Sequence, residues 1–177
     1  MRIYCDWPGV IEAWDLIGST QIQGRASLGG NLCNASPAGD SVPAMVAAGM
    51  TANIAGPDGR RTLPVEEVTA GPGKTNLKKG EFIVSFNLPA KPSNGGDAYL
   101  RLIPRTEMDI AVVGCGVALT LDDSGTVTSA KVSLGAVAAT VSSGRRCCKS
   151  NYWNETRTRG NVCSGCSMSG CMQTNRR

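Results

Sequence analysis

Residues 21–40 combine the residue types that a phosphate-bearing cofactor requires. Gly29 and Gly30 are adjacent, and such glycines let backbone N–H groups approach an anion closely, because no Cβ intervenes and a positive φ is allowed. Polar side chains follow at Asn31, Asn34, Ser36 and Asp40. Asp40 could accept a hydrogen bond from a sugar-alcohol hydroxyl. The simpler interpretation is a tight turn, because glycine and asparagine favour turns in any protein.

Composition excludes several kinds of chemistry. The 177 residues include no histidine. This removes the commonest general base and metal ligand, so Ser-His-Asp, Cys-His and His-zinc sites are all excluded. The length suits one domain or two small ones with a packed core. The net charge of +4 and the eight cysteines are typical of a mildly basic, cysteine-rich protein.

These charges and cysteines are distributed unevenly. Residues 1–140 have 11 basic and 13 acidic side chains and only three cysteines. Residues 141–177 have seven basic side chains, one acidic side chain and five cysteines, and contain no Ala, Leu, Ile or Phe. We therefore interpret residues 1–140 as the folded body and residues 141–177 as a separate tail.

Hydropathy periodicity predicts an α+β body. The expected helices are 10–17 and 42–48, with a helical turn at 65–70. The expected strands are 51–55, 82–88, 99–103, 111–121 and 127–137, with a hairpin turn at 122–125. Residues 21–37 are expected to form an ordered loop. We expect Asp40 to cap the helix over 42–48, and Gly49 to end it.

The segment around the two glycines closely resembles the FAD-binding medium subunit of aerobic carbon monoxide dehydrogenase and related molybdenum hydroxylases, a group that includes xanthine dehydrogenase. The resemblance covers residues 8–137 without a gap. It rests on ordered motifs: Ile17-Gly18-Ser19, the segment 21–40 with its Asn34-Ala35-Ser36-Pro37, the segment 99–111, and Leu134-Gly135-Ala136-Val137. Several motifs at the right separations make the match specific.

The resemblance implies that the chain holds FAD and takes part in electron transfer. In such complexes a large subunit holds the molybdenum cofactor and acts on the substrate. A small subunit holds iron–sulfur clusters and relays electrons to the FAD, which passes them to an external acceptor. The part of this chain would be to hold and tune the flavin.

The resemblance also implies a set of cofactor-binding residues, with no catalytic residue and no metal ligand. The pyrophosphate and ribityl region would be lined by Ala26, Ser27, Leu28, Gly29, Gly30 and Asn31. Further polar contacts would come from Asn34, Ser36 and Asp40. Ile83 would lie near the flavin ring. Arg101 takes a position where some relatives have lysine, and either cation could stabilise negative charge on reduced flavin.

The resemblance implies only part of the family fold. Residues 1–95 correspond to the second subdomain of a two-subdomain, PCMH-type FAD-binding domain. Residues 96–140 correspond to the antiparallel strands that begin the CO dehydrogenase flavoprotein C-terminal domain. The family's first FAD subdomain and its last helices have no counterpart here. We therefore expect a chain incomplete at both ends that retains FAD weakly or not at all, and a non-functional fragment is one alternative.

The cysteine-rich tail suggests a second alternative. Cys163-x-x-Cys166, together with Cys171 and the Cys147-Cys148 pair, is consistent with a zinc or iron–sulfur site. The basic charge is consistent with a nucleic-acid-binding module. Against both, the tail has few apolar residues for a core, and it offers only Tyr152 and Trp153 for stacking on bases.

A frameshift explains the tail better. Residues 149–156 can be encoded so that the frame one base later reads Lys-Ala-Ile-Ile-Gly-Thr-Lys. Residues 171–177 can be encoded so that the same frame reads Ala-Cys-Lys-Pro-Ile-Asp-Asp. Both strings resemble segments that the family has next, in the right order. We therefore expect the chain after about Ser142 to be out of frame and unstructured, and the hypothesis fails if the required codons are absent from the gene.

The sequence also predicts the compartment. Residues 1–7 include Arg2 and Asp6 and have no apolar run, so we expect no signal peptide. The longest apolar stretch, 110–121, is too short to span a bilayer. We expect a cytoplasmic protein with reduced cysteines, in which Cys33 and Cys115 are inert buried thiols, and which binds no nucleic acid.

Overall fold

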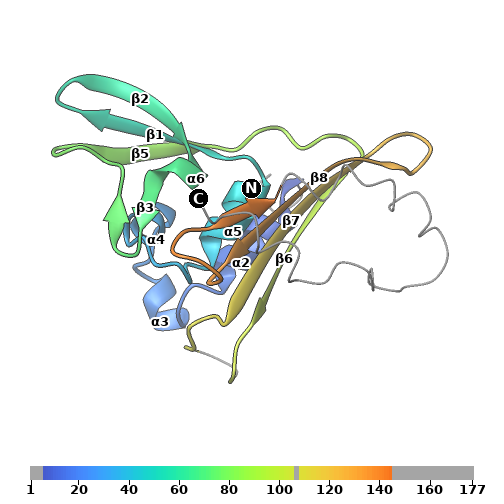
Figure 1. The fold of residues 1–177 in the computed structure, drawn as a ribbon, viewed down its shortest axis with the longest axis horizontal. Helices are drawn as coiled ribbons and strands as arrows, with labels where there is room; N and C mark the ends of the chain where they lie inside the picture. Colours follow the sequence, from blue (N-terminus) through green and yellow to red (C-terminus); the bar gives the residue numbers. More distant parts are fainter. Residues whose placement is uncertain (1–5, 106–107, 145–177) are drawn as a thin grey trace, which may run out of the picture.

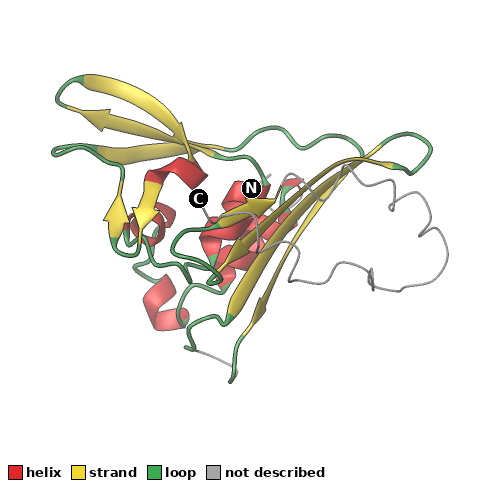
Figure 2. Cartoon of the chain, in the orientation of Figure 1, coloured by secondary structure: helices red, strands yellow, loops and turns green. Residues whose placement is uncertain are grey.

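The computed structural model describes residues 6–105 and 108–144, which form short helices packed between antiparallel sheets (Figure 1, Figure 2). The helices are α2 (Pro8–Asp15), α3 (Thr20–Gln23), α4 (Leu28–Cys33), α5 (Ser41–Ala47) and α6 (Val65–Val68). The strands are β1 (Thr51–Gly56), β2 (Gly59–Pro64), β3 (Thr69–Gly71), β4 (Lys74–Thr75), β5 (Phe82–Asn87), β6 (Gly95–Leu102), β7 (Val113–Leu121), β8 (Val127–Gly135) and β9 (Ser142–Gly144).

The strands make three antiparallel sheets. The first has the order β2-β1-β5, the second pairs β3 with β4, and the third has the order β6-β7-β8-β9. The third sheet positions the site described below, because its register places Tyr99 opposite Gly116 and Arg101 opposite Gly114. Paired residues have side chains on the same face of a sheet, so Tyr99 and Arg101 share one face of β6.

Helix α5 forms the centre of the core. All seven of its residues are buried, and it packs against β7, β8 and α2. Helix α2 packs along β6, where the Tyr99 N–H donates to a carboxylate oxygen of Glu12 at 3.0 Å. This contact satisfies an edge-strand donor that would otherwise lack a partner. One face of the third sheet is therefore covered by helices, whereas the opposite face exposes Leu100 and Leu102.

The predicted α+β class is confirmed, with helices or strands close to the expected ranges and a hairpin turn at 122–125. The loop expected at 21–37 is wrong in part, because α3 and α4 lie within it. Its Gly29 and Gly30 are helical, and Ser27 supplies the N-cap by accepting from the Gly30 N–H at 3.0 Å. Capping by serine offsets the low helix propensity of glycine.

The sheet also extends further than the composition predicts. Residues 142–144 form β9 and pair with β8, with Leu134 opposite Ser142. Backbone pairing on a sheet edge needs no apolar side chains, which explains why composition misses it. The expected unstructured tail and the alternative metal or nucleic-acid module otherwise fall in residues 145–177, outside the described residues. Within the described part of the chain, no helix has the length and apolarity to cross a membrane.

Candidate functional site

A buried ion pair lies where α2, α5 and β6 meet. The Arg101 guanidinium donates to Asp40 Oδ2 at 3.1 Å and to the Leu16 carbonyl oxygen at 3.0 Å. The Tyr99 hydroxyl donates to Asp40 Oδ1 at 3.0 Å. The side chains of Arg101 and Asp40 are only 9% and 12% exposed. Each carboxylate oxygen therefore has its own donor, as a buried charge requires.

Asp40 occupies the N-cap position of α5, as predicted, but its side chain does not cap that helix. It lies directly before α5, yet its side chain makes no capping hydrogen bond to that helix. Its carboxylate turns instead toward β6, because a charged hydrogen bond to arginine is stronger than a bond to a backbone N–H. The helix still ends as predicted at Gly49, whose φ of +73° is the left-handed conformation that glycine tolerates best.

Glycines on β7 and β8 allow α5 to approach the sheet. A Cβ on Gly116 would lie 2.6 Å from the carbonyl oxygen of Pro43 in α5, and a Cβ on Gly135 would lie 2.7 Å from the Pro43 ring. Neither distance is possible for a real side chain at these positions without displacement of the helix. The two glycines thereby set the distance between Asp40, just before α5, and its partners on β6.

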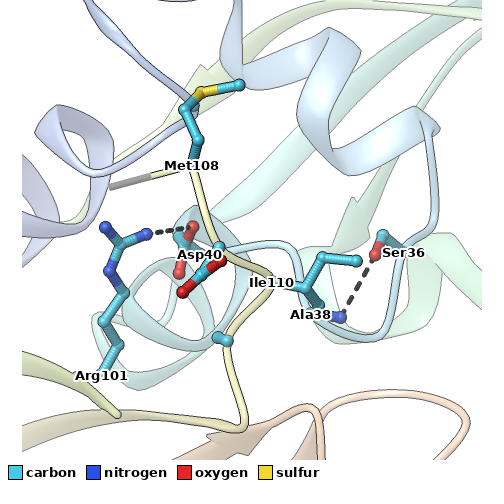
Figure 3. A pocket seen from close by; sticks show the side chains of 9 residues that line it. Ser36, Ala38, Asp40, Arg101, Met108 and Ile110 are labelled. Atoms are coloured by element: carbon cyan, nitrogen blue, oxygen red, sulfur yellow. Dashed lines mark hydrogen bonds and ion pairs between the residues drawn. The ribbon is translucent and has the colours of Figure 1, made fainter. Parts of the chain in front are cut away.

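A pocket of about 200 Å³ opens beside this ion pair. Figure 3 shows Asp40 and Arg101 on one wall, with Met108 and Ile110 on the segment that crosses the pocket. The complete lining is Gly18, Ser36, Ala38, Asp40, Arg101, Met108, Asp109, Ile110 and Ala111. The polar and apolar groups come from segments far apart in the sequence, and the ion pair holds two of these segments together.

The segment that follows β6 is held by a local ion pair. Asp109 accepts from the Arg105 backbone N–H at 2.7 Å and from the Arg105 guanidinium. Met108, between them, has a φ of +58°, an uncommon conformation for a residue with a side chain. From the sequence alone, Arg105, Glu107 and Asp109 are typical of a solvated charge cluster and not of a catalytic set. Glu107 lies outside the described residues, while Arg105 is exposed and Asp109 is turned inward.

Burial dominates the electrostatics of the site. It raises the pKa of Asp40, and the Tyr99 hydroxyl and the Arg101 guanidinium oppose that rise by stabilising the carboxylate. Burial, and then the neighbouring Asp40 charge, raise the pKa of the Tyr99 phenol well above its ordinary value. Tyr99 is therefore a neutral hydrogen-bond donor at any physiological pH.

The residues assigned from the sequence fall into two groups. Ser36, Asp40 and Arg101 line one pocket. Asn31 does not line it, but its side-chain oxygen accepts from the hydroxyl of Ser41, the residue after Asp40, at 2.7 Å. The other assigned residues do not line this pocket: Ala26, Ser27, Leu28, Gly29, Gly30, Asn34 and Ile83. Residues 26–30 lie at the start of α4, and Ile83 lies on β5 opposite Ile54, packed against the core.

Sequence reasoning missed part of the site. Tyr99 shares a face of β6 with Arg101, a signal that the two-residue spacing in the predicted strand could have supplied. In the segment 21–40, the left-handed residue is Ala35, with a φ of +50°, and not Gly29 or Gly30. Nothing in the identity of an alanine indicates that conformation. Met108 and Ile110 lie after the end of β6, where hydropathy periodicity does not predict which way a side chain points.

Two regions of the chain match known protein families. Residues 3–91 match the FAD binding domain in molybdopterin dehydrogenase, and residues 98–150 match the CO dehydrogenase flavoprotein C-terminal domain. The first match alone covers half of the chain. The chain therefore belongs to the family of FAD-binding subunits of molybdenum-containing dehydrogenases, as its motifs indicate.

Individual relatives agree with this family. The chain is 31% identical to the xanthine dehydrogenase FAD-binding subunit of Escherichia coli O157:H7, over 75% of this chain and 46% of that protein. It is 32% identical to the carbon monoxide dehydrogenase medium chain of Hydrogenophaga pseudoflava, over 75% and 46%. A solved carbon monoxide dehydrogenase from Hydrogenophaga pseudoflava matches with a TM-score of 0.75 and 30% identity, over 80% of this chain and 49% of that chain. The chain thus spans about half the length of these relatives.

The donor set of the pocket fits part of an FAD molecule. A carboxylate offers about four lone-pair directions, and Tyr99 and Arg101 use two of those of Asp40, which leaves acceptor capacity for a hydroxyl. The Ser36 hydroxyl accepts from the Ala38 N–H at 3.3 Å and keeps its own proton to donate. The pocket is smaller than the ~300 Å³ or more of a typical cofactor cleft, so it could hold one portion of FAD and not the whole.

Proposed function

We propose that this chain binds FAD through the pocket beside Asp40 and serves as the electron-transfer flavin subunit of a molybdenum hydroxylase. When bound, the flavin would accept electrons from an iron–sulfur subunit and pass them to an external acceptor. The observation that carries the proposal is the buried Asp40–Arg101 pair beside Ser36, within a chain that belongs to an FAD-binding family.

Each residue would make the contact with FAD that suits its side chain. Asp40 would accept hydrogen bonds from hydroxyl groups of the sugar-alcohol chain, and Ser36 would donate one. Met108 and Ile110 would provide apolar contact for an aromatic ring. Residues 26–31, at the start of α4, would lie along the pyrophosphate, and Asn34 would make a further polar contact. Ile83 would lie near the flavin ring.

Arg101 contributes differently from a free cation. Its guanidinium is bound to the Asp40 carboxylate, so the pair as a whole is close to neutral. Stabilisation of negative charge on reduced flavin by Arg101 would therefore be weaker than that by an unpaired lysine or arginine. Its main part in this proposal is to hold Asp40, β6 and the end of α2 in one arrangement.

The partner subunits and the cellular compartment are part of the same proposal. A large subunit with the molybdenum cofactor and a small subunit with iron–sulfur clusters would complete the complex. Cys33 and Cys115 are free thiols that are partly buried, and not fully buried as expected from the sequence. This burial raises the pKa of both, which suits inert cysteines in a reducing compartment. We accordingly propose a cytoplasmic protein.

Flavin identification tests the proposal. The purified chain is incubated with FAD, passed through a desalting column, and denatured to release what it retained. We expect FAD to co-elute with the protein in substoichiometric amounts, with FMN and riboflavin retained less. Elution of the protein free of FAD, even when it is loaded at high FAD concentration, would contradict the proposal.

A further inference from the structure

Tyr99 occupies the centre of the network around Asp40. Its side chain is 4% exposed, and its hydroxyl donates to Asp40 Oδ1 at 3.0 Å. Its backbone N–H is bound to Glu12 on α2. The residue is thereby fixed at both ends, with the phenol oxygen aimed at the carboxylate. Tyr99 does not line the pocket, so any effect on a ligand must pass through Asp40.

The place of the Tyr99 hydroxyl depends on a glycine. Gly114 on β7 is buried, and a Cβ built on it would lie 2.5 Å from the Tyr99 hydroxyl oxygen. The missing side chain therefore leaves the space in which the hydroxyl reaches Asp40. Any larger residue at position 114 would have to move the phenol oxygen away from its present contact.

The Asp40 carboxylate is fixed at both of its oxygens. Tyr99 holds Oδ1 and Arg101 holds Oδ2, so the carboxylate cannot rotate without losing a hydrogen bond. We propose that Tyr99 is a positioning residue of the cofactor site, which acts through Asp40 and orients that carboxylate toward the hydroxyl groups of the bound FAD. This inference rests on the proposed function and adds to it a residue that never contacts the ligand.

The charged and titratable groups around Asp40 make the inference testable by pH. They are Tyr99 and Arg101 on β6, which bond to its carboxylate, and Asp109 in the segment after β6, which lines the same pocket. Cys115 on β7 acts on Tyr99 and is paired with Leu100, on the opposite face of the sheet. Of these, Tyr99 and Arg101 stabilise the ionised form of Asp40. Removing the Tyr99 hydroxyl should thus raise the pKa of Asp40 further and leave the carboxylate protonated over a wider range of pH.

The experiment measures FAD affinity against pH for the wild-type chain and for Tyr99→Phe. We expect the variant to bind FAD about fivefold more weakly near neutral pH, because one hydrogen bond is lost. We also expect the pH below which FAD binding weakens to move upward by about one pH unit. In an Asp40→Ala background, Tyr99→Phe should change FAD affinity less than about twofold, because the residue through which it acts is gone.

A matched control separates positioning from general loss of stability. Trp7→Phe also removes one hydrogen bond of a buried aromatic residue, and its indole N–H donates to the Pro89 carbonyl oxygen and not to Asp40. It should leave the pH dependence of FAD binding unchanged. If Tyr99→Phe behaves like Trp7→Phe, or weakens binding equally in the Asp40→Ala background, Tyr99 is not a positioning residue.

Gly114→Ala gives a second route if Tyr99→Phe does not fold. Its methyl group would displace the Tyr99 hydroxyl and leave the Tyr99 ring in the core. We therefore expect the pH below which FAD binding weakens to rise, as it does in Tyr99→Phe. A folded Gly114→Ala chain with wild-type pH dependence would overturn the inference. Failure of the wild-type chain to bind FAD at any pH would overturn the proposed function instead, so the two failures are distinguishable.

Discussion

Asp40 shows what a sequence can and cannot reveal about a residue. Its type and position predict an acceptor for a hydroxyl group, and the structure places it on the wall of a pocket. The same position also predicts a helix cap, and Asp40 is the N-cap residue of α5, but its side chain bonds to β6 and makes no capping hydrogen bond. The difference arises because its partners, Tyr99 and Arg101, lie 59 and 61 residues away. Local spacing contains no information about partners that only the fold brings together.

The ion pair gives the first stability prediction. Arg101→Met should destabilise the fold by about 3 kcal/mol near neutral pH, because it leaves the Asp40 carboxylate buried without its cation. Burial already raises the pKa of Asp40 above its ordinary value, so the native state binds that proton more tightly than the unfolded chain. Ionisation of Asp40 therefore costs stability as pH rises through its native pKa.

Loss of Arg101 makes this cost larger. The difference in unfolding free energy between wild type and Arg101→Met should grow from about pH 4 to about pH 7, as urea denaturation can measure. Arg60→Met is the control, since Arg60 is an exposed residue of β2, where a single cation contributes little to stability. If the difference in unfolding free energy between wild type and Arg101→Met does not depend on pH, Asp40 stays protonated in the native state.

At the scale of elements, periodicity and turn residues predict the longer helices and most of the strands, but they miss α3, α4 and β2. They also do not predict how closely the elements approach one another. Alternation and turn residues predict β7 and β8 with their connecting hairpin. The contact of α5 with that sheet depends on Gly116 and Gly135, which the sequence shows only as glycines within strands. Such glycines mark either a weak strand or a close backbone approach, and only the structure distinguishes the two.

Gly116→Ala tests this close approach. The new methyl group would overlap the Pro43 backbone, and backbone cannot yield as a flexible side chain can. We expect a loss of about 1–3 kcal/mol of stability in urea denaturation. Gly96→Ala is the matched control on neighbouring β6, because open space surrounds its Cβ position. Equal stabilities of the two variants would contradict the packing of α5 on β7.

A second pair of glycines tests how helices begin and end here. Gly49 has a φ of +73°, so Gly49→Ala should cost about 1 kcal/mol although no atom obstructs the methyl group. Gly29 is helical and equally unobstructed, so Gly29→Ala should stabilise α4 by up to about 1 kcal/mol. Opposite signs are the expected result. A destabilised Gly29→Ala chain would favour the loop that composition predicts for this segment.

At the scale of the whole molecule, the buried network connects the two family regions. Asp40 lies within the residues that match the FAD binding domain, and Tyr99 and Arg101 lie within those that match the flavoprotein C-terminal domain. The resemblance in sequence could assign each region to its family. It could not show that the pocket requires both regions, because their contact is a property of the packed fold. These three side chains join the two regions in one hydrogen-bonded network.

An equilibrium titration shows whether Asp40 and its neighbours bind FAD. FAD fluorescence is followed as wild-type chain and Asp40→Ala chain are added in parallel, with circular dichroism to show that both are folded. We expect weak but saturable binding to the wild type and an affinity at least about tenfold lower for Asp40→Ala, since a hydrogen bond to a charged group is lost. Equal affinities for the two chains, or no binding to the wild type, would contradict the proposal.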